Sequence, residues 1–248
     1  MSFPWFIAFR YLTAKRKQAF ISLISLVSIL GVGVGVMALI IATALMTGVQ
    51  GEMRDRIVGA TAHINVYKTG GGGLLDVEAE IARMRVDGVV GVAPVVLGQG
   101  LIQLAGRAEP VQLKGIDPAR EVQVTDLAGA MQQGSLAALV APPEVGPEEI
   151  PLHDPILLGA DLAARLNAVV GDTVQVMTPE GVLTPVGIAP RFRIFKVVGI
   201  FKLGFYQVDA NFGLIPLSIA QDFLSRSGPD ALQLKVADLD AAPEVSAR

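Results

Sequence analysis

The sequence predicts an α+β protein with one membrane-spanning helix near its N-terminus. Three observations lead to this fold class. From Gln18 to Gly51 the chain contains no charged residue. After Gly51, short β-rich runs alternate with amphipathic segments, without the regular βαβ order of a parallel sheet. The mean hydropathy of the 248 residues is +0.53, which is well above zero.

The composition excludes several classes of function. The net charge of −3 is mild, and no stripe of Lys and Arg with interleaved aromatic residues follows the N-terminal segment, so we expect no nucleic-acid partner. The absence of cysteine removes disulfides, thiolate metal sites, a cysteine nucleophile and a lipidated N-terminal cysteine. Only His63 and His153 are histidines, so a histidine-rich metal site is excluded. We expect neither a metal nor a cofactor in this chain.

The uncharged run is long enough to cross a bilayer. Phe20–Met46 is almost continuously apolar, and a hydrocarbon core of ~30 Å needs roughly 20 helical residues. We therefore expect residues 19–50 to form a transmembrane helix that tilts or projects as a stalk. A buried core helix is the first alternative, but such helices rarely exceed about 20 residues without a charge. A signal peptide is the second, because Ala42-Thr43-Ala44 resembles a cleavage site, but secretory apolar regions span roughly 7–15 residues.

Flanking charges predict the orientation of this helix. Four cations precede it: Arg10, Lys15, Arg16 and Lys17. The following flank mixes acids and bases, namely Glu52, Arg54, Asp55 and Arg56. Lys and Arg near the ends of a span mark its cytoplasmic side, so the N-terminus is expected inside and residues 51–248 outside. Aromatic residues beside the N-terminal cations predict that residues 1–18 form a short amphipathic segment at the inner interface.

A glycine-rich string lies within the run, at Gly31-Val32-Gly33-Val34-Gly35. A nucleotide-binding loop would need a preceding strand, a polar loop and a charged partner, and none accompanies the string. In an apolar helix, Gly31 and Gly35 lie on one face and let another helix approach closely. Glycine lowers helix propensity in water, so we favour helix packing over simple tolerance of small residues in lipid.

The exported part shows the patterns of several short strands and three helices. Asp76–Arg85 suits a helix, since Val77, Ile81 and Met84 recur at helical spacing. Two more helices are expected at Ala160–Leu166 and Ser218–Ser225. Strands are expected at His63–Tyr67, Val89–Val96, Gly100–Leu104, Val111–Ile116, Thr173–Met177, Phe192–Phe201 and Ala231–Val236. Loops or turns are expected at Gly70–Gly73, Asp117-Pro118, the proline-rich Ala141–Pro155 and Gly171-Asp172.

The residues offer no catalytic constellation. Serines are few outside the apolar run, and none lies in a G-x-S-x-G motif. His153 and Asp154 are adjacent in a proline-rich loop, so sequence geometry does not set them face to face as base and orienting acid. His63 lies in an expected strand and is read as a structural or surface residue. We therefore expect binding and mechanics rather than catalysis.

One segment between two β-rich runs is rich in proline and glycine. Between Met177 and Phe192 the chain has three prolines and two glycines. These residues predict a stiffened, non-helical excursion, which can add to the sheet or groove of another protein without losing much entropy. An ordinary long hairpin loop fits the same residues equally well.

Several stretches together resemble the LolC/LolE family of lipoprotein-releasing permeases, within the MacB-like and FtsX-like group of ABC transporter permeases. "FIAFRYLTAKRKQAFISLISLVSILGVGVGVMALI" resembles the family's first span with its lead-in, and "ALMTGVQGEMRDRIVG" its exit into a stalk. Later segments resemble the periplasmic part: "VAPVVLGQG", "VQLKGIDPAREVQVTDL", "LLGADLAARLNAVVGDTVQVM" and "TPVGIAPRFRIFKVVGIFKLGFYQVDANFGLIPL". The resemblance covers nearly the whole chain, and its motifs are specific collectively although weak singly.

The resemblance implies a MacB-like periplasmic domain of two mixed α/β subdomains in a bacterial inner-membrane protein. One subdomain would join residues 51–117 with 205–248, and residues 118–204 would form the other, carrying a hook-like loop at 178–191. It implies that lipoproteins leave the membrane through a permease dimer and pass to a periplasmic carrier, driven by separate cytoplasmic ATPase subunits. The carrier-binding positions would be Thr184, Pro185, Gly187, Pro190 and Arg191.

The resemblance also implies that acyl chains enter the dimer near the outer end of the span. Met46, Thr47, Gly48 and Val49 lie there, with plain contact to bilayer lipid as the alternative. The family continues with three more spans and a cytoplasmic coupling helix, whereas this chain stops at Arg248. We expect a fragment of a longer permease, in which the missing part meets the ATPase, rather than a truncated chain. The second permease subunit is either the same chain or a related one.

Two other functions compete with lipoprotein release. Another MacB-like mechanotransmission permease would couple cytoplasmic ATP hydrolysis to efflux or to regulation of a cell-wall hydrolase. Such a relative needs no loop that captures a carrier, so the hook-like segment discriminates between the two. A single-span hydrolase is disfavoured because its catalytic residues are missing.

Overall fold

The computed structural model describes residues 19–67, 73–74, 76–140, 153–184 and 187–238, together with a few isolated positions near the termini. The described part divides into two units, Met1–Arg54 and Asp55–Arg248. The predicted segment at residues 1–18 lies almost entirely outside the described residues, as do the predicted loop at Gly70–Gly73, apart from Gly73, and most of the loop at Ala141–Pro155.

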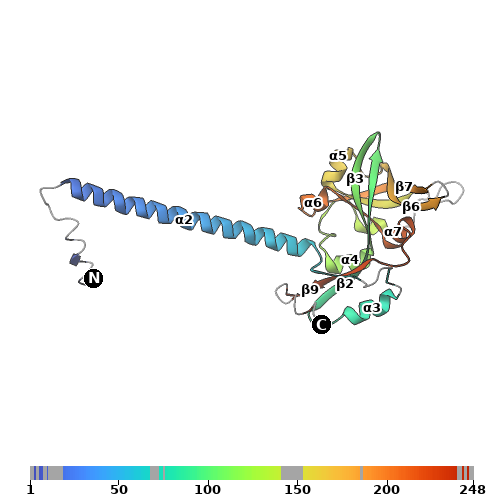
Figure 1. Ribbon diagram of the computed structural model, residues 1–248, viewed down its shortest axis with the longest axis horizontal. Coiled ribbons are helices and arrows are strands. Elements are labelled where there is room, and N and C mark those ends of the chain that lie inside the picture. Colours follow the sequence, from blue (N-terminus) through green and yellow to red (C-terminus); the bar gives the residue numbers. More distant parts are fainter. Residues whose placement is uncertain are drawn as a thin grey trace. The chain divides into compact units, whose positions relative to one another are not determined.

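The uncharged run forms one helix, α2 (Ala19–Ala60), as predicted (Figure 1). Its segment Leu23–Gly51 is long and apolar enough to cross a membrane, and none of its most apolar window is buried by the protein. The helix runs ten residues beyond the predicted end at residue 50. Nothing between Gly51 and Ala60 stops it, because this stretch lacks proline and is rich in helix-forming residues. At 1.5 Å per residue, its 42 residues extend roughly 63 Å, about twice the thickness of a bilayer core.

The unit that follows is a mixed sheet with short helices (Figure 1). Its strands are β1 (Ile64–Tyr67), β2 (Val89–Leu104), β3 (Arg107–Ile116), β4 (Met131–Gly134), β5 (Asp154–Gly159), β6 (Thr173–Thr184), β7 (Gly187–Phe201), β8 (Phe212–Pro216) and β9 (Ala231–Val236). Its helices are α3 (Val77–Met84), α4 (Pro118–Val124), the 3₁₀ turn η1 (Leu136–Leu139), α5 (Ala160–Leu166), α6 (Tyr206–Asp209) and α7 (Leu217–Phe223). One apolar helix followed by a mixed α/β domain confirms the predicted fold class.

Six of the strands close into a ring. β2 pairs with β3, β3 with β8, β8 with β5, β5 with β7, β7 with β6, and β6 again with β2. Inward-facing side chains of this ring form the largest core, where Ile102, Leu113, Ile156 and Phe195 are fully buried. α5 and α7 add apolar residues to this core, and the ring of Phe223 meets Phe195 edge to face with centroids 5.8 Å apart.

The structure corrects several predicted elements. The strands expected at Val89–Val96 and Gly100–Leu104 are one strand, β2. The glycines between them do not break it, because they make room for neighbours: a Cβ at Gly98 would overlap Leu224, and one at Gly100 would lie 2.5 Å from the Met177 carbonyl oxygen. β4, β5, β8, α6 and η1 were not predicted, and β5 begins inside the expected loop Ala141–Pro155.

Asp117-Pro118 begins a helix instead of forming a turn. An Asp117 carboxylate oxygen accepts a hydrogen bond from the Ala119 amide at 3.1 Å, and Pro118 occupies the first turn of α4. An N-cap carboxylate followed by proline is a favourable helix start, since the proline lacks an amide that would otherwise stay unpaired.

The predicted division into two subdomains remains a prediction. Strands from residues 51–117 and 205–248 and strands from 118–204 belong to the same sheet. The pairings β5–β8 and β2–β6 join the two groups.

Candidate functional site: a projecting hairpin and the outer end of the span

The predicted hook-like segment is the outer part of the β6–β7 hairpin, which leaves the sheet at one side of the domain (Figure 1). Near the ring the two strands pair from Thr173 with Lys196 to Thr178 with Arg191. The register then shifts, and pairing resumes from Val182 with Ala189 to Thr184 with Gly187. Both strands are therefore longer than predicted. Their prolines are tolerated because Pro179 and Pro190 lie where the register shifts, and strands accept proline at such irregularities.

Gly181 permits the close approach of the two strands at this irregularity. A Cβ atom on Gly181 would overlap the carbonyl oxygen of Ala189 and lie 2.5 Å from its carbonyl carbon. No side chain fits there, because the obstacle is backbone rather than the end of a flexible side chain. Glycine in a strand often marks such a crossing of two backbones.

A polar network ties the base of the hairpin to α7 and the turn after it. Arg191 Nη1 donates to the carbonyl oxygen of Asp222 at 3.1 Å, and Arg193 Nη1 lies 2.8 Å from the Asp222 carboxylate. Arg193 also pairs with Asp154 through its Nε. On the other strand, Glu180 pairs with Arg226 at 2.9 Å. Each exposed pair contributes at most about 1 kcal/mol, so the network mainly fixes the direction of the hairpin.

The predicted carrier-binding residues occupy different parts of this hairpin. Thr184 and Gly187 pair with each other next to the turn, and Pro185 lies outside the described residues. Pro190 is exposed, whereas Arg191 is half-buried. A guanidinium has five donor hydrogens, so Arg191 keeps donors for another protein beside its bond to Asp222.

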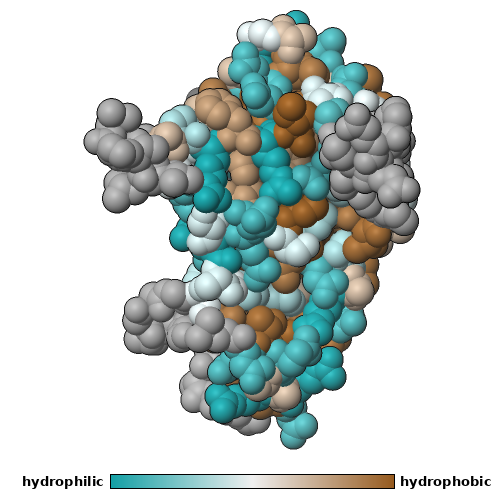
Figure 2. Space-filling view, turned by 90° about the vertical axis from the view of Figure 1, so that its right-hand side faces the viewer, coloured by the Kyte–Doolittle hydropathy of each residue, from teal (hydrophilic) through white to brown (hydrophobic). Residues whose placement is uncertain are grey.

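Apolar side chains at the base of the hairpin were not assigned from the sequence. Phe192 is 57% exposed and Ile194 is 46% exposed, on the face of β7 that points away from the ring. Met177 is paired with Phe192 and Leu101 with Met177, so a partly exposed apolar row crosses β7, β6 and β2. Figure 2 shows the domain from the side at which the hairpin leaves it, where hydrophobic residues form small areas among hydrophilic ones. In the sequence, the alternation of apolar and polar residues in "RFRIF" was the signal from which these exposed apolar side chains could have been predicted.

The other predicted residues lie on α2. Met46 is 61% exposed and Val49 is 49% exposed. The Thr47 hydroxyl donates a hydrogen bond to the Thr43 carbonyl oxygen at 2.8 Å. A Cβ on Gly31, Gly35 or Gly48 would meet nothing within 4 Å. These positions form an open helix surface, suited to lipid or to another helix.

Comparison with known proteins places this architecture in a family. A family model, the MacB-like periplasmic core domain, matches residues 25–248. The chain belongs to this family. The LolC lipoprotein-releasing system transmembrane protein of Xylella fastidiosa is 36% identical over 241 residues, which cover 97% of this chain and 55% of that protein. LolC of Neisseria meningitidis serogroup B is 35% identical over 248 residues, covering 97% and 56%.

The chain thus spans about half the length of the curated relatives it matches. These relatives confirm the predicted resemblance to the N-terminal part of the LolC/LolE family. Among solved structures, the periplasmic region of MacB from Actinobacillus actinomycetemcomitans aligns with a TM-score of 0.42 and 14% identity, covering 74% of this chain and 80% of that one.

Proposed function

We propose that this chain is the N-terminal part of an ABC transporter permease subunit that releases lipoproteins from the bacterial inner membrane. In this proposal α2 is the first span, the N-terminus is cytoplasmic, and the β-sheet unit lies in the periplasm. ATP is hydrolysed by separate subunits, and a second permease subunit, the same or related, completes the pathway. Identity of 36% to a LolC protein over 97% of the chain supports the proposal.

In the same proposal, the β6–β7 hairpin holds the periplasmic carrier that receives the lipoprotein. The outer part of the hairpin, beyond Thr178 and Arg191, pairs only within itself among the described residues. Both of its edges therefore offer backbone groups to another protein. A preformed hairpin loses little entropy on binding, and strand addition or groove insertion is a common mode of recognition. This projecting hairpin is the observation that carries the proposal.

The span supplies the second part of the proposed mechanism. The outer end of α2, at Met46–Val49, offers an apolar surface to the acyl chains of a lipoprotein. Each CH₂ group that stays buried is worth about 0.8 kcal/mol. Gly31 and Gly35 give α2 a flat face against which a helix of the partner subunit packs.

The test removes the outer hairpin and leaves the sheet intact. Residues 179–190 are replaced by Asn-Gly, so that Thr178 and Arg191 close a two-residue turn. The matched control places the same dipeptide at Ala105-Gly106, the β2–β3 turn, where both residues already have positive φ. Binding of the cognate carrier to the full chain in nanodiscs is measured by pull-down and titration calorimetry.

We expect the shortened hairpin to abolish carrier binding and the control to bind like the parent. Unchanged far-UV circular dichroism checks that both variants are folded. Equal carrier binding by both variants contradicts the role of the hairpin, and it favours a MacB-like permease that works without a carrier.

A further inference from the structure

The outer part of the β6–β7 hairpin, residues 179–190, joins the ring at an irregular place (Figure 1). Regular pairing ends at Thr178 with Arg191 and resumes at Val182, so three residues of β6 lie opposite a single residue of β7. Each strand has a proline in this gap, and proline supplies no amide to the ladder. An extra residue in one strand bends it and changes its direction. The backbone ladder alone therefore does not fix the angle between the outer part and the ring.

Glu180 lies in this gap and is the only charged residue in the sequence of the outer part, "PEGVLTPVGIAP". Its carboxylate pairs with Arg226, in the turn after α7, at 2.9 Å. Both side chains are only about one-third exposed. The single charge of the outer part is thus engaged inside the molecule, with a residue that does not belong to the hairpin.

Arg226 is itself held in place by the segment between α7 and β9. Its Nε lies 3.4 Å from Asp230 Oδ1. Asp230 is fixed on β2, because its other carboxylate oxygen accepts from the Leu97 amide at 2.8 Å and its own amide donates to the Val95 carbonyl oxygen at 2.9 Å. A continuous chain of contacts therefore runs from β2 through Asp230 and Arg226 to Glu180.

The position of this chain of contacts gives a weak ion pair a large effect. An exposed pair adds little to the stability of a whole domain. At the gap, however, it acts where the backbone ladder is interrupted, so it competes only with the bending of two strands. A binding element that already has the direction of the bound state loses less entropy when it binds.

We propose that Arg226 is a positioning residue for the hairpin. By holding Glu180 it sets the angle at which the outer part leaves the ring, and it strengthens carrier binding without touching the carrier. The inference rests on the proposed carrier-binding function of the hairpin. It adds a determinant of affinity that lies outside the hairpin, in the turn between α7 and β9.

The first measurement needs no carrier. The chain contains no cysteine, so spin labels can be attached at Thr184→Cys, next to the turn of the hairpin, and at Gln103→Cys, on the exposed surface of β2. Double electron–electron resonance on the full chain in nanodiscs gives the distribution of the distance between the two labels. A second pair, Gln103→Cys with Gln133→Cys on β4, lies outside the outer part and is the reference.

We expect a narrow distribution for the hairpin pair in the parent chain. Glu180→Gln and Arg226→Gln should each broaden it, and the double variant should be no broader than the single ones, because both changes break the same contact. The reference pair should stay unchanged. The matched control is Arg83→Gln, which breaks the exposed pair with Glu80 at 3.1 Å on α3 and should broaden neither distribution.

The second measurement is titration calorimetry of the same variants, without labels, against the cognate carrier. Glu180→Gln and Arg226→Gln should each weaken carrier binding about two- to fivefold, which is the range that an exposed ion pair supports. The double variant should bind as weakly as either single variant, since the second change has no contact left to break. Arg83→Gln should bind like the parent.

Three results overturn the inference. Unchanged distance distributions in both single variants mean that the pair does not position the hairpin. Additive losses of affinity mean that Arg226 contacts the carrier itself. Unchanged affinity beside a broadened distribution means that the angle does not matter for binding. A parent chain that binds no carrier refutes the proposed function instead, and the distances still decide whether Arg226 holds the hairpin in one direction.

Discussion

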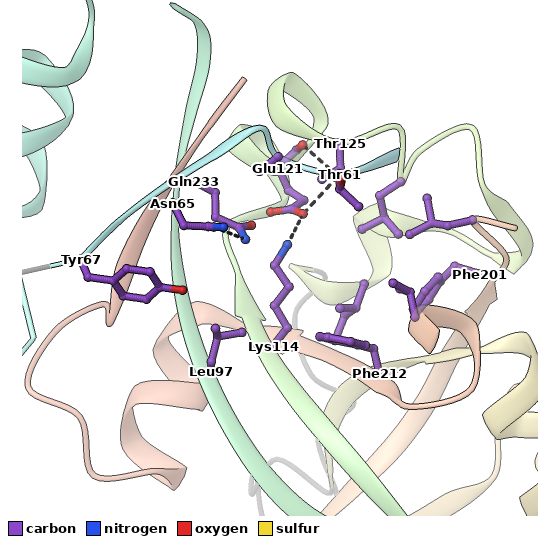
Figure 3. Close-up of a pocket in the computed structure, with 15 residues that line it drawn as sticks. Thr61, Asn65, Tyr67, Leu97, Lys114, Glu121, Thr125, Phe201, Phe212 and Gln233 are labelled. Carbon is purple, nitrogen blue, oxygen red and sulfur yellow. Dashed lines mark hydrogen bonds and ion pairs between the residues drawn. The ribbon is translucent and has the colours of Figure 1, made fainter. Parts of the chain in front are cut away.

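The buried ion pair between Lys114 and Glu121 (Figure 3) should behave as a coupled unit in the stability of the domain. Lys114→Met leaves a carboxylate that is 2% exposed with the Thr125 hydroxyl as its only side-chain donor among the described residues. Removing one partner of a buried pair costs about 3–5 kcal/mol, because the other charge stays buried without compensation. For a domain of this size, this loss lowers the melting temperature by roughly 6–20 °C. Glu121→Leu should lower the free energy of unfolding by a similar amount, since it leaves the Lys114 ammonium without its counter-ion.

The double variant should recover most of that stability. With both charges gone, no uncompensated charge is buried, and an apolar pair of similar volume is often neutral or better. Thr125 keeps an acceptor, because its hydroxyl also lies 3.3 Å from the Glu121 main-chain carbonyl oxygen. We expect the double variant to lie within about 1 kcal/mol of the parent chain. The coupling energy between the two positions is then several kcal/mol.

Urea unfolding of residues 55–248, followed by far-UV circular dichroism, measures these differences. Equal m-values among the variants ensure that the same amount of surface is exposed on unfolding. Single variants that each lose less than about 1 kcal/mol would mean that water reaches the pair as at an exposed salt bridge. Additive losses in the double variant would mean that the two side chains do not stabilise each other, and the reasoning from burial would fail.

Three further predictions concern topology, lipid contact and the core. A reporter that is active only in the periplasm, fused after Val66, should be active, and activity of a cytoplasmic reporter there instead would reverse the proposed orientation. Photo-crosslinkers at Met46 and Val49 in the full-length complex should capture lipoprotein, whereas capture of phospholipid alone would refute the proposed acyl-chain site. Phe195→Ala should cost about 3–5 kcal/mol in urea unfolding, because the side chain is fully buried and packs edge to face on Phe223; a loss below about 1 kcal/mol would mean that the core closes over the cavity.

Strong local patterns predicted most of the fold. The long uncharged run, the helical spacing in α3 and the alternation in β1, in the middle of β3 and in β9 are visible because each follows one period over several residues. β2 was divided at its glycines, since the reason for them lies in Leu224 and Met177, far along the chain. β5 and β8 were missed because both are central strands that are buried on both faces, so neither shows alternation.

The candidate sites also differ in how much of each could be predicted from the sequence. The hook-like segment was located by its resemblance to the LolC/LolE family, and its prolines and glycines are local signals that agree with it. Its anchoring by Asp222 and Arg226 was not predictable, because these residues belong to α7 and the turn that follows it. The group of polar residues around Glu121 could not be predicted from the sequence either. Asn65, Lys114, Glu121 and Gln233 come from four elements and meet only because the sheet brings them together.

Pro190 and Pro179 have a consequence for self-association. Among the described residues, β1 and β4 each pair with one strand only, and the outer hairpin pairs only within itself, so all three have a free edge. An open hairpin edge invites edge-to-edge pairing between copies of the same protein, which leads to aggregation. Each strand of this hairpin carries a proline, which has no backbone amide to donate. The backbone hydrogen bonds to an added strand are therefore interrupted after a few residues. A short segment of another protein can therefore still pair with the hairpin edge, while extended strand pairing between two copies of the hairpin is blocked.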